Sequence, residues 1–179
     1  MTLTLDYAVE SLPLAKPFRI SGHVFTEAPV VVVTLSDGTH SGRGEAAGVY
    51  YLGDDVAAMT AAIEGARAAV EAGITRDGLQ SLLPAGGARN AIDCALWELG
   101  ARRSGTPVHE LADLPEPRPL RTTFTLGADD PEVMAAGARD FAQARALKLK
   151  LTGDLDLDIA RVDAVRAAIS RSSSAMVKP

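Results

Sequence analysis

The sequence predicts an α+β unit built on a short antiparallel sheet, followed by the beginning of a parallel α/β unit. Three observations predict this organisation. Strand-like segments follow one another in the first 50 residues, segments of helical periodicity come next, and strand-like and helical segments alternate after residue 119. Four prolines within residues 107–119 are typical of a connector. The predicted domains are residues 1–115 and residues 120–169, with an irregular tail over residues 170–179.

The first unit is expected to begin with a three-stranded antiparallel meander. Residues 3–9 alternate apolar and polar side chains, which is the period of a half-buried strand. Two prolines predict a loop over residues 13–27. The valine-rich residues 29–35 and the residues 40–47 form two further strands, joined by an Asp-Gly pair that tolerates the backbone angles of a tight turn.

Helices follow the meander. Asp54 or Asp55 can cap a helix over residues 56–70, because the apolar side chains of that segment recur with helical spacing. A short helix is expected near residues 77–83, and a longer one over residues 88–103. The glycine pairs around residues 42–44 and 86–87 lack the context of a phosphate loop and are interpreted as turns.

The second unit alternates strands and helices. Residues 122–127 and 146–151 are β-prone, and a helix can begin at Asp130 because proline follows it at the first helical position. Strands separated by helices imply a parallel sheet, since a parallel pair needs a crossover connection. The acidic residues at 154, 156 and 158 lack the glycine and glutamate of a calcium loop, and they are interpreted as favourable partners of a helix dipole.

Composition excludes several classes of protein. The net charge of −5 lacks the basic excess of a nucleic-acid binder. No apolar run approaches the length of a membrane helix, and the first residues do not have the pattern of a signal peptide. The single cysteine, Cys94, cannot form an internal disulfide and is expected to pack in the core. The expectation is a soluble, acidic, cytoplasmic protein, with a homo-oligomer left open.

Two of the chain's four lysines lie together in residues 146–151. Because side chains alternate across a strand, the three leucines of this segment share one face, and Lys148 and Lys150 share the other. Strands of a parallel sheet are normally apolar on both faces, so a lysine face is unusual there. If that face is the interior of a closed barrel, mutual repulsion and lost solvation lower the pKa of a lysine, as a general base requires.

Five segments, taken in order, resemble the amino-terminal part of the enolase superfamily in its muconate-lactonizing branch, and most closely the dipeptide epimerases. The resemblance runs from about residue 3 to residue 168. The matching segments are PLAKPF at 13–18, GRGEAA at 42–47, ARNAIDCALWEL at 88–99, TFTL at 123–126 and LKLKL at 147–151.

The resemblance implies a capping domain followed by a TIM-type barrel, and a mechanism based on Mg²⁺ and lysine. It implies that Lys150 removes the α-proton of a dipeptide or an N-acyl amino acid. Lys148 is then expected to lower the pKa of Lys150 and to contact the substrate carboxylate. Thr125 corresponds to a substrate-contacting position. His23 is expected to bind substrate from the capping loop, where related epimerases carry arginine.

The chain is expected to hold only part of such an enzyme. The 60 residues from Leu120 to Pro179 suffice for two βα units, whereas a complete barrel needs about 250 residues. The metal ligands of the family lie on later strands, so no metal-ligating residue is assigned and the isolated chain is expected to be inactive. Two alternatives stay open: a non-catalytic chain that oligomerises or binds a partner, and a cycloisomerase or dehydratase of the same superfamily.

Overall fold

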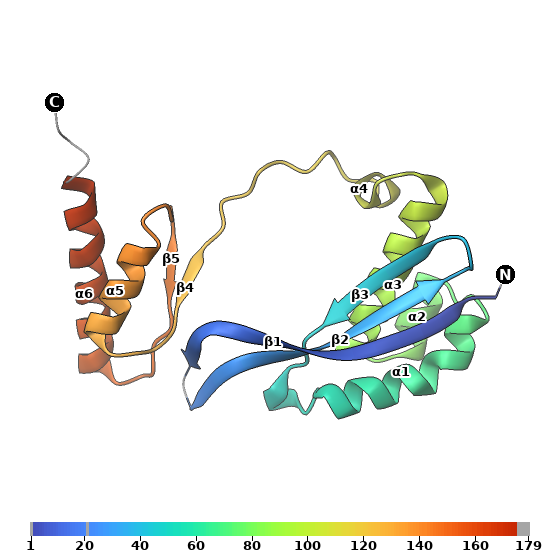
Figure 1. The fold of residues 1–179 in the computed structure, drawn as a ribbon, viewed down its shortest axis with the longest axis horizontal. Helices are drawn as coiled ribbons and strands as arrows, with labels where there is room; N and C mark the ends of the chain where they lie inside the picture. Colours follow the sequence, from blue (N-terminus) through green and yellow to red (C-terminus); the bar gives the residue numbers. More distant parts are fainter. Residues whose placement is uncertain (1, 21, 175–179) are drawn as a thin grey trace. The chain divides into compact units, whose positions relative to one another are not determined.

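The computed structural model describes residues 2–20 and 22–174 and divides them between two units (Figure 1). Unit 1 holds the residues up to Leu12 together with Ala28–Pro117. Unit 2 holds Pro13–Glu27 together with the residues from Arg118 onward. The segment that the sequence assigns to a loop of the first domain therefore groups with the second unit.

The sheet of the first part of the chain has the strand order β1-β2-β3. β2 and β3 pair antiparallel, with Val33 opposite Gly44 and Leu35 opposite Gly42. This arrangement confirms the predicted meander followed by helices. The elements are β1 (Thr4–Ile20), β2 (His23–Ser36), β3 (Ser41–Ala46), the single turn η1 (Tyr50–Leu52), α1 (Val56–Glu71), α2 (Arg76–Leu82), α3 (Gly87–Ser104) and α4 (Val108–Leu111).

The core of unit 1 lies between the sheet and α1–α3 (Figure 1). Ten of its large side chains are at most 1% exposed, and burying each of them contributes about 1.5–3 kcal/mol. They come from strands with a period of two and from helices with a period near 3.6, which the sequence pattern predicted. These side chains are Leu5, Val31, Val33, Leu35, Met59, Ile63, Val70, Leu79, Ile92 and Leu99.

β3 packs directly on α3 because its positions that face the helix are small. Gly42 and Gly44 are buried, while the residues between and beside them are exposed. A Cβ atom added to Gly44 would overlap the carbonyl oxygen of Ala91 and lie 2.7 Å from the nitrogen of Ala95. The interpretation of these glycines as a turn is therefore wrong, because they allow a strand to approach a helix backbone closely. Cys94 is exposed, so its predicted place in the core is also wrong.

Two adjacent aspartates begin two different helices of unit 1. The Asp55 carboxylate accepts a hydrogen bond from the Ala58 amide at 2.8 Å and caps α1. The Asp54 carboxylate accepts one from the Gly87 amide at 2.9 Å, at the start of α3. A carboxylate at a helix start satisfies an amide that has no partner within the helix and interacts favourably with the helix dipole.

The predicted loop over residues 13–27 is wrong, since β1 continues to Ile20 and β2 begins at His23. The prediction depended on two prolines as strand breakers. β1 is an edge strand, however, with a neighbour on one side only. Proline lacks an amide proton and is tolerated on the open side of an edge strand, so Pro13 and Pro17 are compatible with an extended hairpin arm.

Unit 2 places two helices against two parallel strands (Figure 1). The buried cluster of Leu126, Met134, Ala138 and Val165 joins them. This parallel βα arrangement confirms the predicted change of fold pattern. The helix predicted to end at residue 169 continues to Ser174, which corrects the irregular tail, and residues 175–179 lie outside the described residues. The elements are β4 (Phe124–Leu126), α5 (Pro131–Asp140), β5 (Leu147–Leu149) and α6 (Leu155–Ser174).

Candidate active site

β4 and β5 bring three of the predicted site residues together. Thr125 lies directly opposite Lys148 in the parallel register. The pairing continues one residue past the end of β5, because the Lys150 amide donates to the carbonyl oxygen of Leu126 at 3.0 Å. Lys148 therefore lies on β5 and Lys150 directly after it, and Thr125 lies beside them on the neighbouring strand β4.

The two faces of β5 differ in the way that the leucine–lysine alternation predicts. Leu147 and Leu149 are half-buried and pack on the cluster formed with α5 and α6. Lys148 is exposed on the opposite face. Lys150 follows the strand and is half-buried. The leucine side is held by apolar contacts, and the lysine side is left for polar chemistry.

Aromatic packing fixes the start of β4. The rings of Phe124 and Phe141 lie 4.9 Å apart, centroid to centroid, in a tilted arrangement. The Phe124 amide also donates to the carbonyl oxygen of Ala146 at 3.1 Å. Such a pair contributes about 0.5–1.5 kcal/mol beyond its buried area, so it helps to set the register that aligns Thr125 with Lys148.

His23 begins β2, on the hairpin arm that groups with unit 2. Its imidazole lies edge-on to the ring of Phe25, with centroids 4.2 Å apart, and the residue is exposed. A neutral imidazole holds a carboxylate less strongly than an arginine does, because it offers one donor and no charge. The aromatic neighbour gives this position an apolar side as well.

The hairpin arm contacts the segment that follows β4, which sequence reasoning missed. The Arg19 carbonyl oxygen accepts a hydrogen bond from the Ala128 amide at 2.9 Å. The Arg19 guanidinium lies 3.5 Å from the Asp129 carboxylate. A Cβ atom on Gly127 would lie 3.0 Å from the Arg19 nitrogen, so glycine permits this close approach. No periodicity in the sequence could have revealed these contacts, because they join segments more than 100 residues apart.

The described residues offer no group of three or more His, Cys, Asp or Glu side chains that could hold a metal ion. The residues present in these ranges thus do not fit a magnesium site. Similarly, none of the helices in the described ranges has the length and hydropathy that a membrane crossing requires.

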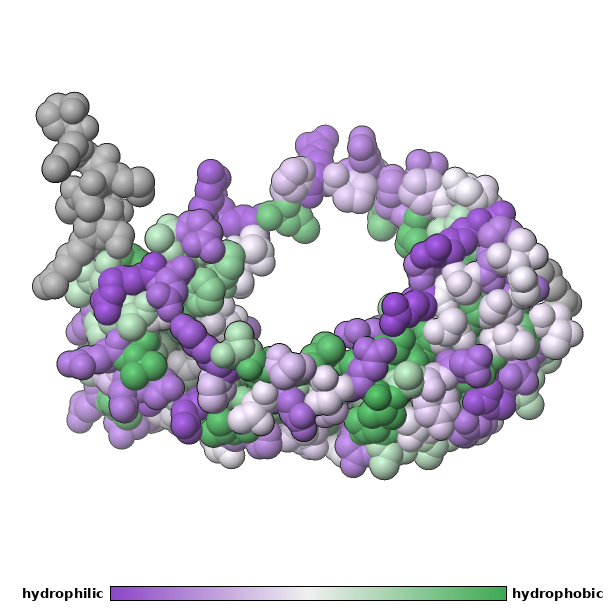
Figure 2. Space-filling model, viewed as in Figure 1, coloured by the Kyte–Doolittle hydropathy of each residue, from purple (hydrophilic) through white to green (hydrophobic). Residues whose placement is uncertain are grey.

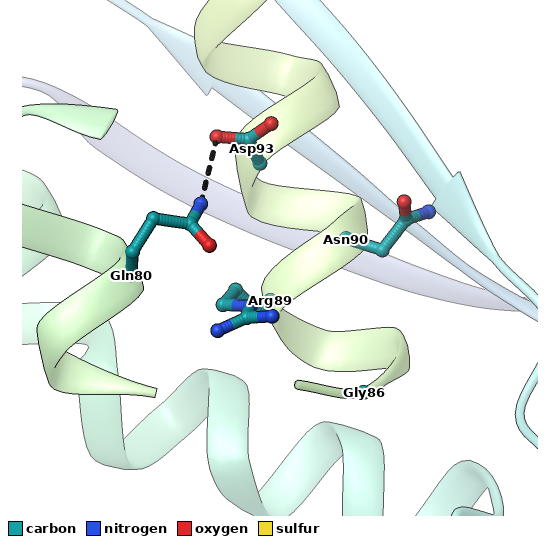
Figure 3. Close-up of a pocket in the computed structure, with 5 residues that line it drawn as sticks. All are labelled: Gln80, Gly86, Arg89, Asn90 and Asp93. Atoms are coloured by element: carbon teal, nitrogen blue, oxygen red, sulfur yellow. Dashed lines mark hydrogen bonds between the residues drawn. The ribbon is translucent and has the colours of Figure 1, made fainter. Parts of the chain in front are cut away.

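A polar hollow of about 280 Å³ lies between α2 and α3 of unit 1 (Figure 3). Figure 3 shows Gln80 reaching from α2 toward Asp93 on α3, with a hydrogen bond of 3.4 Å from its amide nitrogen to the carboxylate. Arg89 donates to the carbonyl oxygen of Leu83 at 3.3 Å. These side chains are engaged with one another or with the backbone, and none of them is a predicted site residue.

The chain thus combines a three-stranded antiparallel sheet covered by helices with a parallel pair of strands, the second of which carries the two lysines. The family described as mandelate racemase / muconate lactonizing enzyme, N-terminal domain, matches residues 4–112. The chain belongs to this family. The predicted resemblance to the enolase superfamily is thereby confirmed.

The curated relatives of the chain include epimerases, a racemase and a cycloisomerase. The chain is 39% identical to the L-Ala-D/L-Glu epimerase of Escherichia coli strain K12, over 93% of this chain and 52% of that protein. It is 31% identical to a hydrophobic dipeptide epimerase of Roseobacter litoralis, over 83% of this chain and 45% of that protein. The chain thus spans about half the length of the curated relatives it matches.

Solved structures agree with this assignment. An enolase family member from Agrobacterium tumefaciens, with homology to dipeptide epimerases and with bound sodium and L-Ala-L-Glu, superposes with a TM-score of 0.87 at 39% identity. The match covers 94% of this chain and 51% of that one. An L-Ala-D/L-Glu epimerase superposes with a TM-score of 0.78 at 37% identity, with the same coverage. The epimerases among these relatives belong to the class of enzyme that the sequence predicts, the isomerases.

Proposed function

We propose that this chain is the amino-terminal part of a dipeptide epimerase in which Lys150 removes the α-proton of the substrate. The observation that carries the proposal is the strand register, which sets Thr125 opposite Lys148, two residues before Lys150. The 39% identity to an L-Ala-D/L-Glu epimerase supports it.

Each residue has a defined part in the proposed reaction. The amine of Lys150 accepts the proton from the α-carbon: its lone pair forms the new N–H bond, and the electron pair of the broken C–H bond moves into the adjacent carbonyl group of the substrate as an enolate. The Lys148 ammonium attracts the substrate carboxylate to the position beside Lys150. The Thr125 hydroxyl orients the substrate by hydrogen bonding. His23 contacts the substrate from the capping hairpin.

Magnesium enters this proposal only through the relatives. Solved dipeptide epimerases from Enterococcus faecalis and Methylococcus capsulatus are complexes with Mg and a dipeptide. The described residues of this chain do not form a site that fits the ion. We therefore assign this chain the lysine half of the proton-transfer chemistry and no step at a metal.

The test is α-proton exchange in deuterium oxide, followed by the loss of the α-proton NMR signal. The chain is joined to the part of the E. coli epimerase that it does not cover, and it is supplied with Mg²⁺. We expect exchange on a dipeptide. A joined protein that folds and exchanges no α-proton contradicts the proposal. The unjoined chain, assayed in parallel, tests the prediction that it is inactive by itself.

The choice of substrate sharpens the same assay. Because an imidazole lacks the bidentate donors with which arginine binds a carboxylate, we expect a hydrophobic dipeptide such as L-Leu-L-Tyr to exchange faster than L-Ala-L-Glu. Muconate tests the main alternative, since the chain is also 28% identical to muconate cycloisomerase 1 of Rhodococcus opacus over 93% of its length. Turnover of muconate without dipeptide exchange would favour a cycloisomerase.

A further inference from the structure

Asp158 and Arg161 are buried charged residues on α6. They are 8% and 5% exposed, and the Arg161 guanidinium lies 2.7 Å from the Asp158 carboxylate. Removing two charges from water costs more than their mutual attraction returns, unless further hydrogen bonds satisfy them. An apolar pair of similar volume would often stabilise such a site at least as well. The pair therefore depends on its further hydrogen bonds, which join it to other segments of unit 2.

The hydrogen bonds of this pair converge on the segments that follow β4 and β5. The Asp158 carboxylate accepts from the amides of Thr152 and Gly153, at 3.1 Å and 2.8 Å. Arg161 donates to the Thr152 hydroxyl at 2.8 Å and to the carbonyl oxygen of Asp129 at 2.7 Å. Asp129, Thr152, Asp158 and Arg161 form what we call the strand-end clamp.

The clamp lies immediately after the two lysines in the chain. Thr152 follows Lys150 by two residues. Asp129 follows Leu126 by three, and the Leu126 carbonyl oxygen accepts the Lys150 amide. A two-stranded parallel ladder of three residues is weak by itself, because both of its edges are open. Backbone hydrogen bonds to β4 restrain the lysine segment itself. The strand-end clamp restrains the residues that follow it.

We propose that Asp158 and Arg161 are positioning residues that set the placement of Lys148 and Lys150 at the end of β5. This inference rests on the proposed function for the role of the lysines. Neither residue of the pair touches the reacting atoms. Their effect passes through Thr152 and through the backbone that joins it to Lys150.

The test uses the full chain with its amines ¹³C-methylated, because four lysines give a simple NMR spectrum. Lys148→Arg and Lys150→Arg assign the two signals of interest. The double variant Asp158→Leu with Arg161→Met replaces the pair by apolar side chains of similar volume. Asp163→Asn is the control for the loss of one carboxylate, and it is matched to Asp158→Asn, since it removes the same negative charge from an exposed position of the same helix. Circular dichroism reports whether each variant keeps its helices.

We expect the double variant to keep its helices while the methyl signals of Lys148 and Lys150 shift. The Lys150 amide should exchange with solvent about tenfold faster, since its local restraint is lost. The Lys16 signal and the Asp163→Asn spectrum should stay as in the wild type. A folded double variant with unchanged lysine signals would overturn the proposal, and so would an equal shift in Asp163→Asn. If the double variant does not fold, Asp158→Asn is judged by the same signals.

This outcome is separable from that of the proposed function. The spectrum contains no substrate, so it reports only whether the clamp sets the lysines. Absence of α-proton exchange in the joined protein, together with lysine signals that depend on Asp158, would contradict the epimerase proposal and leave the clamp intact. α-Proton exchange in the joined protein, together with lysine signals that do not change in the double variant, would support the epimerase proposal and contradict the role of the clamp.

Discussion

Different interactions stabilise the interior of each unit. Sixteen buried residues form the core cluster of unit 1, whereas six form that of unit 2, among the side chains that the structure describes. Unit 2 adds the buried charges of Asp158 and Arg161, whereas exposed apolar side chains occur in both units, such as Leu52 at 73% and Leu155 at 72%. Figure 2 shows hydrophobic residues among the polar ones at the surface of both units. Apolar packing therefore dominates the interior of unit 1, whereas the interior of unit 2 also depends on a few buried polar groups.

A larger side chain at position 44 tests the close packing of unit 1, and it has the largest expected effect on stability. We expect Gly44→Val to cost at least about 3 kcal/mol of unfolding free energy, because the new side chain meets the backbone of Ala91 and Ala95 rather than a movable side chain. Urea unfolding followed by the fluorescence of Trp97, the chain's single tryptophan, measures the change. Gly65→Ala is the control: its Cβ meets nothing within 4 Å, and alanine in a helix interior stabilises by about 0.5–1 kcal/mol. A loss of stability below 1 kcal/mol for Gly44→Val would contradict the close packing.

One substitution made in both cores compares the units directly. Leu99 in unit 1 is 1% exposed and Leu126 in unit 2 is 6% exposed. Leucine-to-alanine changes in cores cost about 2–5 kcal/mol, with the lower values where the site can collapse. We expect Leu99→Ala near the upper end and Leu126→Ala near the lower end. Native-state hydrogen exchange, read separately for the amides of each unit, measures both, and equal losses would refute the contrast.

Acid should weaken both units, through different carboxylates. Asp37 in unit 1 accepts hydrogen bonds from the His40 amide, the Arg103 guanidinium and the Thr39 amide, which together hold its pKa well below the ordinary value of 3.8. In unit 2, burial raises the pKa of Asp158, but the hydrogen bonds of the clamp outweigh burial and leave that pKa lowered.

A lowered pKa in the folded state means that the carboxylate stabilises the fold above its unfolded pKa and loses this effect as the pH falls through the folded value. We therefore expect both units to lose stability progressively below about pH 4. Asp37→Asn should flatten the acid dependence of unit 1 alone, and Asp158→Asn that of unit 2 alone. Hydrogen exchange between about pH 3 and pH 6 separates the two. An unchanged slope in either variant would show that another group carries the effect.

The sequence predicted those parts of the fold that depend on local periodicity. The valine strand of β2, the apolar stripes of α1 and α3 and the leucine–lysine alternation of β5 are confirmed. Two of the predictions that went wrong treated proline and glycine by local rules alone. Pro13 and Pro17 are tolerated because β1 is an edge strand. Position 44 requires glycine because the backbone of α3 lies against it. Both reasons are tertiary, so no local pattern contains them.

The candidate site shows the same division. The alternation of residues 146–151 pointed to Lys148 and Lys150, and the structure adds that Thr125 is the register partner of Lys148. Sequence reasoning interpreted the acidic residues of 154–158 as helix caps. Asp154 does accept the Leu157 amide at 3.2 Å, but Asp158 turns inward to the segment after β5. The inward role depends on where the helix packs, and a helix start alone does not specify it.

The central claim is that Lys150 is the base of a proton-transfer site, and deuterium incorporation at the α-carbon of a dipeptide tests it most directly. The measurement compares the joined protein with its Lys150→Ala and Lys16→Ala variants. Lys16 is the control because its ammonium is exposed and paired with Asp140 at 2.9 Å. We predict that incorporation falls by at least about 100-fold in Lys150→Ala, the scale of a lost general base, and stays near the unsubstituted rate in Lys16→Ala. Retained incorporation in a folded Lys150→Ala protein would contradict the claim.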